Sequence, residues 1–348
     1  MIDLINRLAC EQHLDNNNLT QLIEACCHHD NSFNQLRDKA TQVARKQFGL
    51  GVYMRGLVEI SSYCRNNCYY CGLRRDNRNA SRYRLNYDEI LACCQKGYDA
   101  GLRTFVLQGG EDAAFTDDQL VKLIAQLRLQ CPEAAITLSL GERKAESYQR
   151  LFEAGASRYL LRHEAANKSL YGEIHPGEMS YDNRINCINS LIKIGYQTGM
   201  GMMVGVPNQT IAHLVEDLLL MQKIGPAMIG IGSFIPHPDT PFGLHGAGDL
   251  RLTYIVIAIA RLMHPHALIP ATTALQTLSP TGYVDGILSG ANVVMPNITP
   301  LSSRSKYEIY PGKEQSQNDI TSTLNNLSHQ LSTIGYHLNP SRGDHGAN

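Results

Sequence analysis

Apolar runs alternate with segments of helical period from about Leu57 onward. The runs occupy residues 56–60, 104–108, 135–140, 158–162, 198–204, 227–232, 267–271 and 291–295. Eight strands alternating with helices is the count of a closed parallel (β/α)8 TIM-type barrel, which is an α/β fold. An open doubly wound sheet is the alternative, but no strand is followed by the GxGxxG turn of its dinucleotide-binding members. The pattern therefore predicts the barrel.

Cap signals mark the starts of two of the intervening helices. Thr210 precedes an apolar stripe with the i, i+3, i+4 and i+7 spacing, which predicts a helix with one face packed on the sheet. Asn86, with Glu89 three residues later, forms a capping-box pattern before a second apolar stripe. Both signals favour helices that cover a central sheet.

The chain divides into three predicted parts. Residues 1–50 form an N-terminal helical extension, with helices over residues 3–13, 18–28 and 32–49. Residues 51–318 form the barrel, and residues 319–348 form a last amphipathic helix and a polar tail. We expect the tail, NPSRGDHGAN, to be mobile because it is polar and terminal. The extension fits three roles equally well: covering the barrel, mediating dimerisation or docking a partner.

Composition narrows the function classes. The 348 residues carry a formal net charge of -1 and are 43% hydrophobic, so nothing global points to nucleic acid or to a membrane surface as a partner. The N-terminal residues lack the pattern of a signal peptide, and no apolar run approaches the length of a membrane span. We therefore expect a soluble cytoplasmic protein, whose cysteines are reduced thiols, buried residues or metal ligands rather than disulfides.

Three cysteines follow the first predicted strand directly. Because barrel enzymes carry their chemistry at the carboxyl ends of the strands, Cys64, Cys68 and Cys71 are expected at the active mouth. A structural zinc ion normally takes four ligands, so three thiols need either a distant fourth ligand or a different metal group. Three thiolates suit a 4Fe–4S cluster with one open iron. Zinc binding and simple burial of the thiols are the alternatives.

The spacing of these cysteines, Cx3CxxC with Tyr70 before the last, resembles the signature of the radical S-adenosylmethionine superfamily. The resemblance implies one 4Fe–4S cluster whose open iron is chelated by the amino and carboxylate groups of S-adenosylmethionine. It also implies an external electron donor, and cleavage of the cofactor to methionine and a 5'-deoxyadenosyl radical. In such enzymes the cofactors supply the difficult chemistry and the protein orients them.

Polar residues at other strand ends fit the same mouth. In LQGGED, after the second strand, Gly109 and Gly110 permit close backbone approach, and Glu111 is an acceptor for the methionine ammonium of the implied cofactor. In LLRHE, after the fourth strand, Arg162 and Glu164 bring charges that are costly to bury unless paired. A glycine-rich turn and a structural ion pair remain the simpler explanations of these two segments.

Seven further segments resemble the HydE family, the radical S-adenosylmethionine maturases of FeFe-hydrogenase. They are CGLRRDN (71–77), TLSLGE (137–142), RYLLRHE (158–164), GIGSFIPHPDTP (230–241), IPATTA (269–274), GANVVMPN (290–297) and YPGK (310–313). The resemblance runs from about residue 50 to 315 and keeps the order of the segments. The helices before it fit the family more loosely.

This resemblance assigns roles residue by residue. It implies that Cys64, Cys68 and Cys71 hold the cluster, that Glu164 contacts the cofactor ribose and that Arg184 contacts its carboxylate. The residues expected to line the cavity for an anionic substrate are Arg162, Thr272, Thr273, His237 and Tyr307. The residues expected to bind S-adenosylmethionine are Tyr70, Gly109, Gly110, Glu111, Ser139, Glu164, Arg184 and Met203. His237, which lies between two prolines, is equally explained as a rigid loop residue.

The implied substrate is a small organometallic or cysteine-derived species, an iron complex with carbonyl, cyanide and cysteine ligands formed during maturation of the FeFe-hydrogenase H-cluster. The implied partners are a tyrosine-cleaving maturase and a scaffold GTPase. Some members of the family carry a second cysteine motif after YPGK. This chain has no cysteine beyond Cys187, so we expect a single cluster.

Three other functions compete with this interpretation. Methylornithine synthase shares the expected barrel and cysteine loop, and other radical mutases or sulfur-chemistry enzymes belong to the same class. Biotin synthase needs cysteines on inner strands, and no predicted strand has one. From a different class, an RNA-binding zinc module fits the arginines and tyrosines interleaved between Arg65 and Tyr87. The balanced charge of the remaining chain argues against it.

Overall fold

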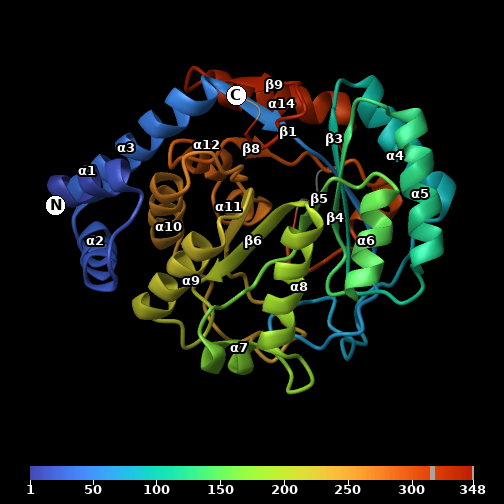
Figure 1. The fold of residues 1–348 in the computed structure, drawn as a ribbon, viewed down its shortest axis with the longest axis horizontal. Coiled ribbons are helices and arrows are strands. Elements are labelled where there is room, and N and C mark those ends of the chain that lie inside the picture. The colour runs from blue at the N-terminus through green and yellow to red at the C-terminus, as the bar shows by residue number, and fades with distance from the viewer. Residues whose placement is uncertain (314–317, 347–348) are drawn as a thin grey trace.

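A ring of parallel strands forms the centre of the structure, with helices outside it (Figure 1). The computed structural model describes residues 1–313 and 318–346. Within them, six strands pair in parallel in the order β2 to β7. These strands are β2 (Gly56–Ser61), β3 (Thr104–Gly109), β4 (Ala135–Ser139), β5 (Arg158–Leu160), β6 (Gln197–Val204) and β7 (Met228–Ser233). Their residues are mostly buried on both faces, as expected for a parallel sheet under helices.

Isolated bridges close this sheet into a barrel. Met228 pairs with Leu268, and Pro270 pairs with Val293 of β8 (Val293–Val294). Asn297 then pairs with Leu57 of β2, which completes the ring. The predicted barrel is therefore confirmed. The run at 267–271 forms only single bridges, because Pro270 has no N–H to donate to a continuous ladder.

Most of the outer helices follow barrel strands. Their bounds are α4 (Tyr87–Asp99), α5 (Asp117–Gln130), α6 (Ala145–Glu153), α7 (Lys168–Ile174), α8 (Tyr181–Ile194), α9 (Ile211–Ile224), α10 (Leu250–Met263), α11 (Thr273–Leu278), α12 (Gly282–Ile287) and α13 (Leu301–Arg304). The capping box of Asn86 and Glu89 begins α4, and Thr210 caps α9 through the His213 N–H. Both predicted helix starts are confirmed.

Three N-terminal helices pack beside α10, at the left of Figure 1. They are α1 (Ile2–Glu11), α2 (Asn16–His28) and α3 (Asp30–Phe48), within two residues of the predicted starts and ends. Helix α10 is apolar on nearly all faces and is buried from Thr253 to Met263, because the barrel covers one side and these helices cover the other. None of the described helices is long and apolar enough to cross a membrane.

A second small sheet, not predicted from the sequence, joins both ends of the chain. Strand β1 (Gly51–Met54) lies between β8 and β9 (His337–Asn339), which follows α14 (Ile320–Ser332). The last described residues fold back onto the barrel: the buried Arg158 side chain donates to the carbonyls of Arg342 and Gly343 and to the Asp344 carboxylate. The expectation of a mobile tail is wrong for these residues, because a buried guanidinium binds them. The last two residues of the predicted tail lie outside the described part.

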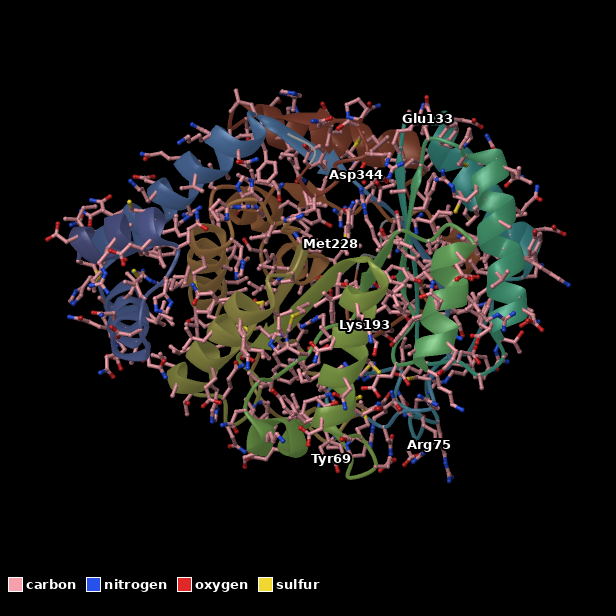
Figure 2. All side chains as sticks on the ribbon, in the orientation of Figure 1. Tyr69, Arg75, Glu133, Lys193, Met228 and Asp344 are labelled. Carbon is pink, nitrogen blue, oxygen red and sulfur yellow. The ribbon has the colours of Figure 1, made fainter. Side chains whose placement is uncertain are left out.

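The two ends of the barrel differ in chemistry. Figure 2 shows Asp344 at one end of the view and Tyr69 and Arg75, both from the cysteine loop, at the other. This loop, residues 62–86, connects β2 to α4 and so starts at the carboxyl end of a strand. The fold therefore separates the end closed by the tail from the end that carries the candidate chemistry.

Candidate active site

The cysteine loop has no regular secondary structure, and its shape depends on hydrogen bonds from an arginine. Arg82 donates to the carbonyl oxygens of Ser62, Leu73, Arg74 and Asn77, and so ties four points of the loop together. Arg84, near the end of the loop, pairs with Asp112, which also accepts from the Ser61 hydroxyl. These contacts fix the shape of the loop.

Two glycines let other segments approach this loop closely. A Cβ at Gly72 would collide with the Glu308 carbonyl and with the His237 ring, and a Cβ at Gly110 would collide with the Tyr63 carbonyl and Cys64. The Gly72 N–H donates to the Ile309 carbonyl at 2.9 Å. The loop therefore packs against the segment after α13 and against the end of β3 with no room for a side chain at either place.

The three thiols of the loop are all half-buried. Burial raises the pKa of Cys71 to about 12, and it raises the pKa of Cys68 and Cys64 as well. The Cys68 sulfur contacts the Met179 sulfur at 3.6 Å. Among the described residues, no three His, Cys, Asp or Glu side chains are arranged to hold a single metal ion. Loading of the thiols with metal must displace their protons, because thiolate is the binding form.

A cavity of about 340 Å³ opens beside the loop and extends into the barrel. Apolar side chains from several strands form much of its wall, as is usual for small-molecule sites. The predicted site residues that line it are Cys68, Tyr70, Cys71, Gly109, Ser139, Arg162, Glu164, Met203, Thr272, Thr273 and Tyr307. Residues far apart in the chain thus meet at the carboxyl ends of the strands, as expected for a barrel enzyme.

Several buried polar atoms in this cavity have no hydrogen-bond partner among the described residues. They are Nε and Nη2 of Arg162, Oε2 of Glu164 and Oγ1 of Thr272. The Arg162 and Glu164 side chains form an ion pair, with Nη2 and Oε2 3.0 Å apart. The geometry of this pair is not that of a hydrogen bond, so both atoms still lack one. Since buried polar atoms are rarely left without partners, these donors and acceptors are available to a ligand in the cavity.

Backbone geometry directs Arg162 and Glu164 into the cavity. Glu164 has a φ of 67°, uncommon for a residue with a side chain, and its N–H donates to the Gly201 carbonyl of β6. His163, between them, is fully buried on the far side and bonds to Asp217 of α9 at 3.0 Å. Consecutive side chains point in alternating directions, so His163 packs into the wall while the charged side chains of Arg162 and Glu164 enter the cavity.

Five predicted site residues do not line the cavity. Gly110 and Cys64 belong to the close approach described above, and His237 packs its ring against Gly72. The Glu111 carboxylate accepts from Arg65 at 2.9 Å and from the Glu142 N–H at 2.9 Å, at the edge of a separate surface depression.

Arg184 is buried beneath the mouth. It donates from Nη1 to the Arg162 carbonyl at 2.6 Å and from Nε to Glu142 at 2.5 Å. In these positions Arg184 and Glu111 already have partners, so each would have to exchange a contact in order to touch a ligand directly.

The structure adds residues to the cavity that the sequence patterns did not indicate. Gln108 donates to the Tyr307 hydroxyl at 3.3 Å. Lys313, from the YPGK segment, lines the cavity, forms a buried ion pair with Glu59 of β2 and lies 4.4 Å from the centre of the Tyr307 ring. Glu59 lies within an apolar strand, where a carboxylate is costly to bury unless a cation pairs with it. This was the one signal in the sequence that could have predicted a buried cation such as Lys313.

Tyr70 has a defined hydrogen bond behind the cysteine loop. Its hydroxyl lies 3.1 Å from Nε2 of His175, and Nδ1 of His175 lies 2.9 Å from the Tyr171 carbonyl. A carbonyl only accepts, so Nδ1 is the donor and Nε2 accepts from Tyr70. Burial, with the nearby Arg184 charge, lowers the pKa of His175 to about 3, so this histidine is neutral at physiological pH.

This fold, with three cysteines on the first βα loop at the cavity mouth, defines a class of enzyme. Residues 58–221 match the model of the Radical SAM superfamily. The chain is also 45% identical over 293 residues to the FeFe hydrogenase maturase subunit HydE of Thermotoga maritima. The aligned region covers 84% of this chain and 83% of that protein. The chain belongs to the HydE family of radical S-adenosylmethionine enzymes. Its cofactors are a 4Fe–4S cluster and S-adenosylmethionine.

Two further comparisons show the breadth of the fold. The 3-methylornithine synthase of Methanosarcina barkeri is 29% identical over 300 residues, covering 84% of this chain and 83% of that protein. The crystal structure of a methylornithine synthase superposes with a TM-score of 0.83 at 25% identity, covering 97% of each chain. The barrel and its N-terminal helices are therefore shared across enzymes whose names describe different reactions.

Proposed function

We propose that Cys64, Cys68 and Cys71 hold the 4Fe–4S cluster and that S-adenosylmethionine binds beside it in the mouth of the barrel. One observation carries the proposal: a cavity next to the three thiols is lined by Arg162, Glu164 and Thr272, whose buried polar atoms include several with no hydrogen-bond partner among the described residues. The thiols fit the group chemically, since iron–sulfur clusters are held by cysteine thiolates. Held by these three thiolates, a reduced cluster would supply the one electron needed to cleave a carbon–sulfur bond of S-adenosylmethionine to methionine and a 5'-deoxyadenosyl radical.

The residues around the cavity have separate tasks in this proposal. Glu164 accepts hydrogen bonds from the cofactor ribose, and its strained backbone keeps the carboxylate aimed inward. Ser139 and Met203 line the same wall, and Gly109 lets the cofactor lie close to the backbone, whereas Gly110 makes room for the cysteine loop. Arg184 bonds to the Glu142 carboxylate, and Glu111 accepts from the Glu142 N–H. By exchanging these contacts, Arg184 would bind the cofactor carboxylate and Glu111 would bind its ammonium group.

We further propose that the substrate is a cysteine-bound iron complex with carbonyl and cyanide ligands, used in FeFe-hydrogenase maturation. Arg162, Thr272 and Thr273 face the cavity with donors that suit cyanide and carboxylate acceptors. Tyr307 lines the same cavity beside Lys313, and the His237 ring packs against Gly72 of the cysteine loop. The proposal includes a cytoplasmic location, an external electron donor, a tyrosine-cleaving maturase that supplies the complex and a scaffold GTPase that receives the product.

A methylornithine synthase reaction is the second candidate, supported by the close structural likeness to that enzyme. In that case the Arg162 and Glu164 pair would hold the carboxylate and ammonium of an amino acid. A biotin synthase reaction is less well supported, because the described strands contain no cysteine and only Cys68 and Cys71 reach the cavity. The RNA-binding module has little support, since Arg65, Arg82 and Arg84 are engaged within the protein.

The first test measures 5'-deoxyadenosine. The chain is purified without oxygen, reconstituted with iron and sulfide, reduced with dithionite and mixed with S-adenosylmethionine. Deoxyadenosine is expected from the native chain and not from a variant with all three cysteines of the loop changed to alanine. A variant of Cys93, a buried helix cysteine in α4, changed to alanine serves as the matched control. The proposal fails if the native protein retains zinc instead of iron and makes no deoxyadenosine.

A second assay separates the two substrates. The reconstituted protein is incubated either with a synthetic iron–cysteine complex carrying carbonyl and cyanide or with lysine, and the rate of deoxyadenosine formation is compared with the rate without substrate. Stimulation by the iron complex alone supports the maturase assignment. Stimulation by lysine, with methylornithine as the product, would replace it.

A further inference from the structure

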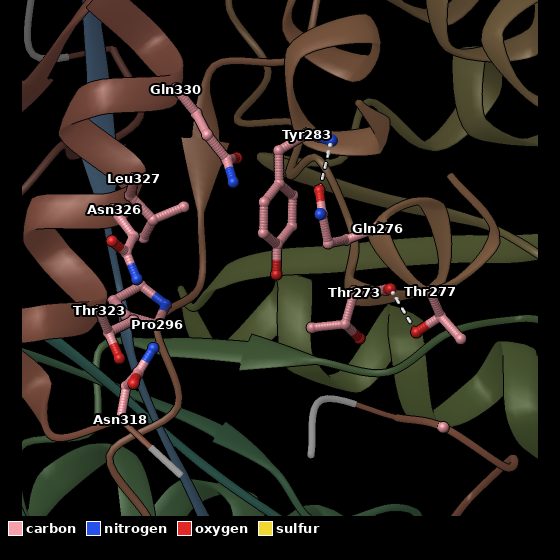
Figure 3. A pocket seen from close by; sticks show the side chains of 11 residues that line it. Thr273, Gln276, Thr277, Tyr283, Pro296, Asn318, Thr323, Asn326, Leu327 and Gln330 are labelled. Atoms are coloured by element: carbon pink, nitrogen blue, oxygen red, sulfur yellow. Dashed lines mark hydrogen bonds between the residues drawn. The ribbon is translucent and has the colours of Figure 1, made fainter. Parts of the chain in front are cut away.

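The walls of the active cavity are held in different ways. Thr273 lies on one wall, at the start of α11, and its carbonyl accepts from the Thr277 hydroxyl one helix turn later at 2.9 Å (Figure 3). This contact lies within a single helix. Glu164 lies in the turn after β5, and this turn depends on contacts from two other elements, β6 and α9.

Glu164 is the central residue of a strained three-residue turn. Its φ is 67°, and the Ala165 N–H donates to the His163 carbonyl at 2.9 Å, which closes a γ-turn of the rare kind with a positive central φ. Among the described residues other than glycine, only Gln12 and Asn208 also have a positive φ. Asparagine adopts this region readily, and Gln12 ends a helix, where this conformation is common. Glu164 has neither advantage, so its conformation needs support from the surrounding structure.

A single carboxylate connects the two ends of this turn. Oδ1 of Asp217 lies 3.0 Å from Nε2 of His163 and 2.6 Å from the Ala166 nitrogen, and it accepts a hydrogen bond from each. His163 precedes Glu164 by one residue and Ala166 follows it by two, so one oxygen atom is bonded on both sides of the strained residue. In addition, the Glu164 N–H donates to the Gly201 carbonyl of β6. These bonds oppose relaxation of the Glu164 φ to the usual negative range.

Asp217 occupies an unusual position for a charged residue. It lies on the buried face of α9 with Leu214 and Leu218, and the side chains of Asp217 and His163 have no exposed surface. Burial of a carboxylate is costly unless hydrogen bonds compensate for it. Asp217 is not among the described residues that line the active cavity, so it does not touch a ligand there. Its bonds act on the cavity through the turn that carries Glu164.

We propose that Asp217 is a positioning residue for S-adenosylmethionine, which holds the turn through His163 and Ala166 and so keeps the Glu164 carboxylate directed at the cofactor ribose. This inference rests on the proposed contact between Glu164 and the cofactor. A negative φ would turn the Cβ of Glu164 relative to the backbone and would displace its carboxylate. Because hydrogen bonds weaken steeply when their geometry is distorted, this displacement lowers the affinity for the cofactor.

The test removes the acceptor in Asp217→Leu, a side chain of similar size without oxygen. Asp217→Asn keeps an oxygen that can accept both bonds and puts its amide nitrogen in place of Oδ2, which has no partner among the described residues. The matched control is Glu216→Leu on the same helix, because the Glu216 carboxylate accepts from the Asn167 side chain, beyond the turn. If Asp217→Leu does not fold, His163→Phe removes the Nε2–H donor and retains a buried ring.

Binding of S-adenosylmethionine to the cluster-loaded protein is measured by isothermal titration calorimetry without a reductant, so that the cofactor is not consumed. Asp217→Leu is expected to raise the dissociation constant about tenfold, because a hydrogen bond from a ligand to a charged group is displaced. Asp217→Asn is expected to restore most of the affinity, and Glu216→Leu is expected to bind like the native chain. The iron content of the same samples is expected to be equal, which separates a loss of cofactor affinity from a loss of the cluster.

Two further measurements distinguish positioning from a general structural role. Asp217→Leu combined with Glu164→Gln is expected to bind as weakly as Glu164→Gln alone, because both changes act through one contact. The second measurement is hydrogen–deuterium exchange of the metal-free chain, followed by mass spectrometry of peptides that contain Ala166. Asp217→Leu, but not Glu216→Leu, is expected to speed exchange there, because the Ala166 N–H loses its acceptor.

Three outcomes would overturn the inference: an unchanged dissociation constant in the folded Asp217→Leu or His163→Phe protein, an equally large further loss of affinity when Asp217→Leu is added to Glu164→Gln, or binding by Asp217→Asn as weak as by Asp217→Leu. Glu164→Gln alone reports on the proposed function. If it binds S-adenosylmethionine as tightly as the native chain, the proposed contact fails and the inference fails with it. If Glu164→Gln weakens binding and Asp217→Leu does not, only the inference fails.

Discussion

Replacing Asp344 with asparagine tests whether the C-terminal residues stabilise the barrel. The Asp344 carboxylate lies 2.8 Å from the Arg158 guanidinium, which is fully buried, and is itself about one quarter exposed. Burial raises the carboxyl pKa, but hydrogen bonds from Arg158 and Arg342 outweigh it and lower the pKa to about 2. The ordinary value is 3.8, so folding favours the ionised form.

The shift of this pKa gives the expected magnitude. At about 1.4 kcal/mol per pKa unit, it corresponds to about 2 kcal/mol of folding free energy. The partial exposure of Asp344 screens the pair, so about 1–2 kcal/mol is expected for Asp344→Asn at pH 7. Because the folded-state pKa is lowered, the contribution is complete above about pH 4 and is lost as the pH falls toward 2. At pH 3 about half of it remains.

Urea unfolding of the metal-free chain, followed by circular dichroism at pH 7 and pH 3, measures this effect. Asp182→Asn is the control, because Asp182 forms an exposed ion pair with Lys168 and its loss is expected to cost less than about 0.5 kcal/mol. The interpretation would be refuted if Asp344→Asn cost no more than the control at pH 7, or if its cost did not decrease at pH 3.

Three further predictions concern the active end. Gly72→Ala is expected to abolish most iron uptake because its Cβ has no space, whereas Gly172→Ala, with nothing within 4 Å, should leave the iron content unchanged. Lys313→Met is expected to destabilise the chain by about 3 kcal/mol or more by leaving Glu59 buried without its cation, and adding Glu59→Gln should restore part of the loss in urea unfolding. Glu164→Gln is expected to raise the KM for S-adenosylmethionine about tenfold or more at unchanged iron content, since a hydrogen bond to a charged group is lost; an unchanged KM would contradict its proposed role.

Hydrophobic periodicity was enough to predict the barrel, because its strands are buried on both faces and appear as apolar runs. It missed β1 and β9, which are only four and three residues long and depend on each other across the length of the chain. It overestimated the run at 267–271, where the backbone forms bridges but no ladder. Short strands with distant partners carry too little local pattern to be predicted.

The sequence predicted those site residues whose position is fixed by a motif at a strand end. It did not predict those whose position depends on a partner far away in the chain. Cys68, Arg162 and Glu164 line the cavity because a strand end sets their location. Glu111 was expected to face the cofactor, but its carboxylate is bonded to Arg65 and to a backbone N–H from the next βα loop. Lys313 was overlooked because its significance depends on a carboxylate 254 positions away. Such pairings exist only in three dimensions.

The contact between the cysteine loop and the segment after α13 has a consequence for biosynthesis. Gly72 donates to the Ile309 carbonyl, and Glu59, just before the loop, pairs with Lys313. Although the cysteines emerge early from the ribosome, the residues that pack against their loop are translated near the end of the chain. The loop therefore reaches its final shape only when nearly the whole chain has been made, so we expect cluster insertion to follow translation rather than accompany it.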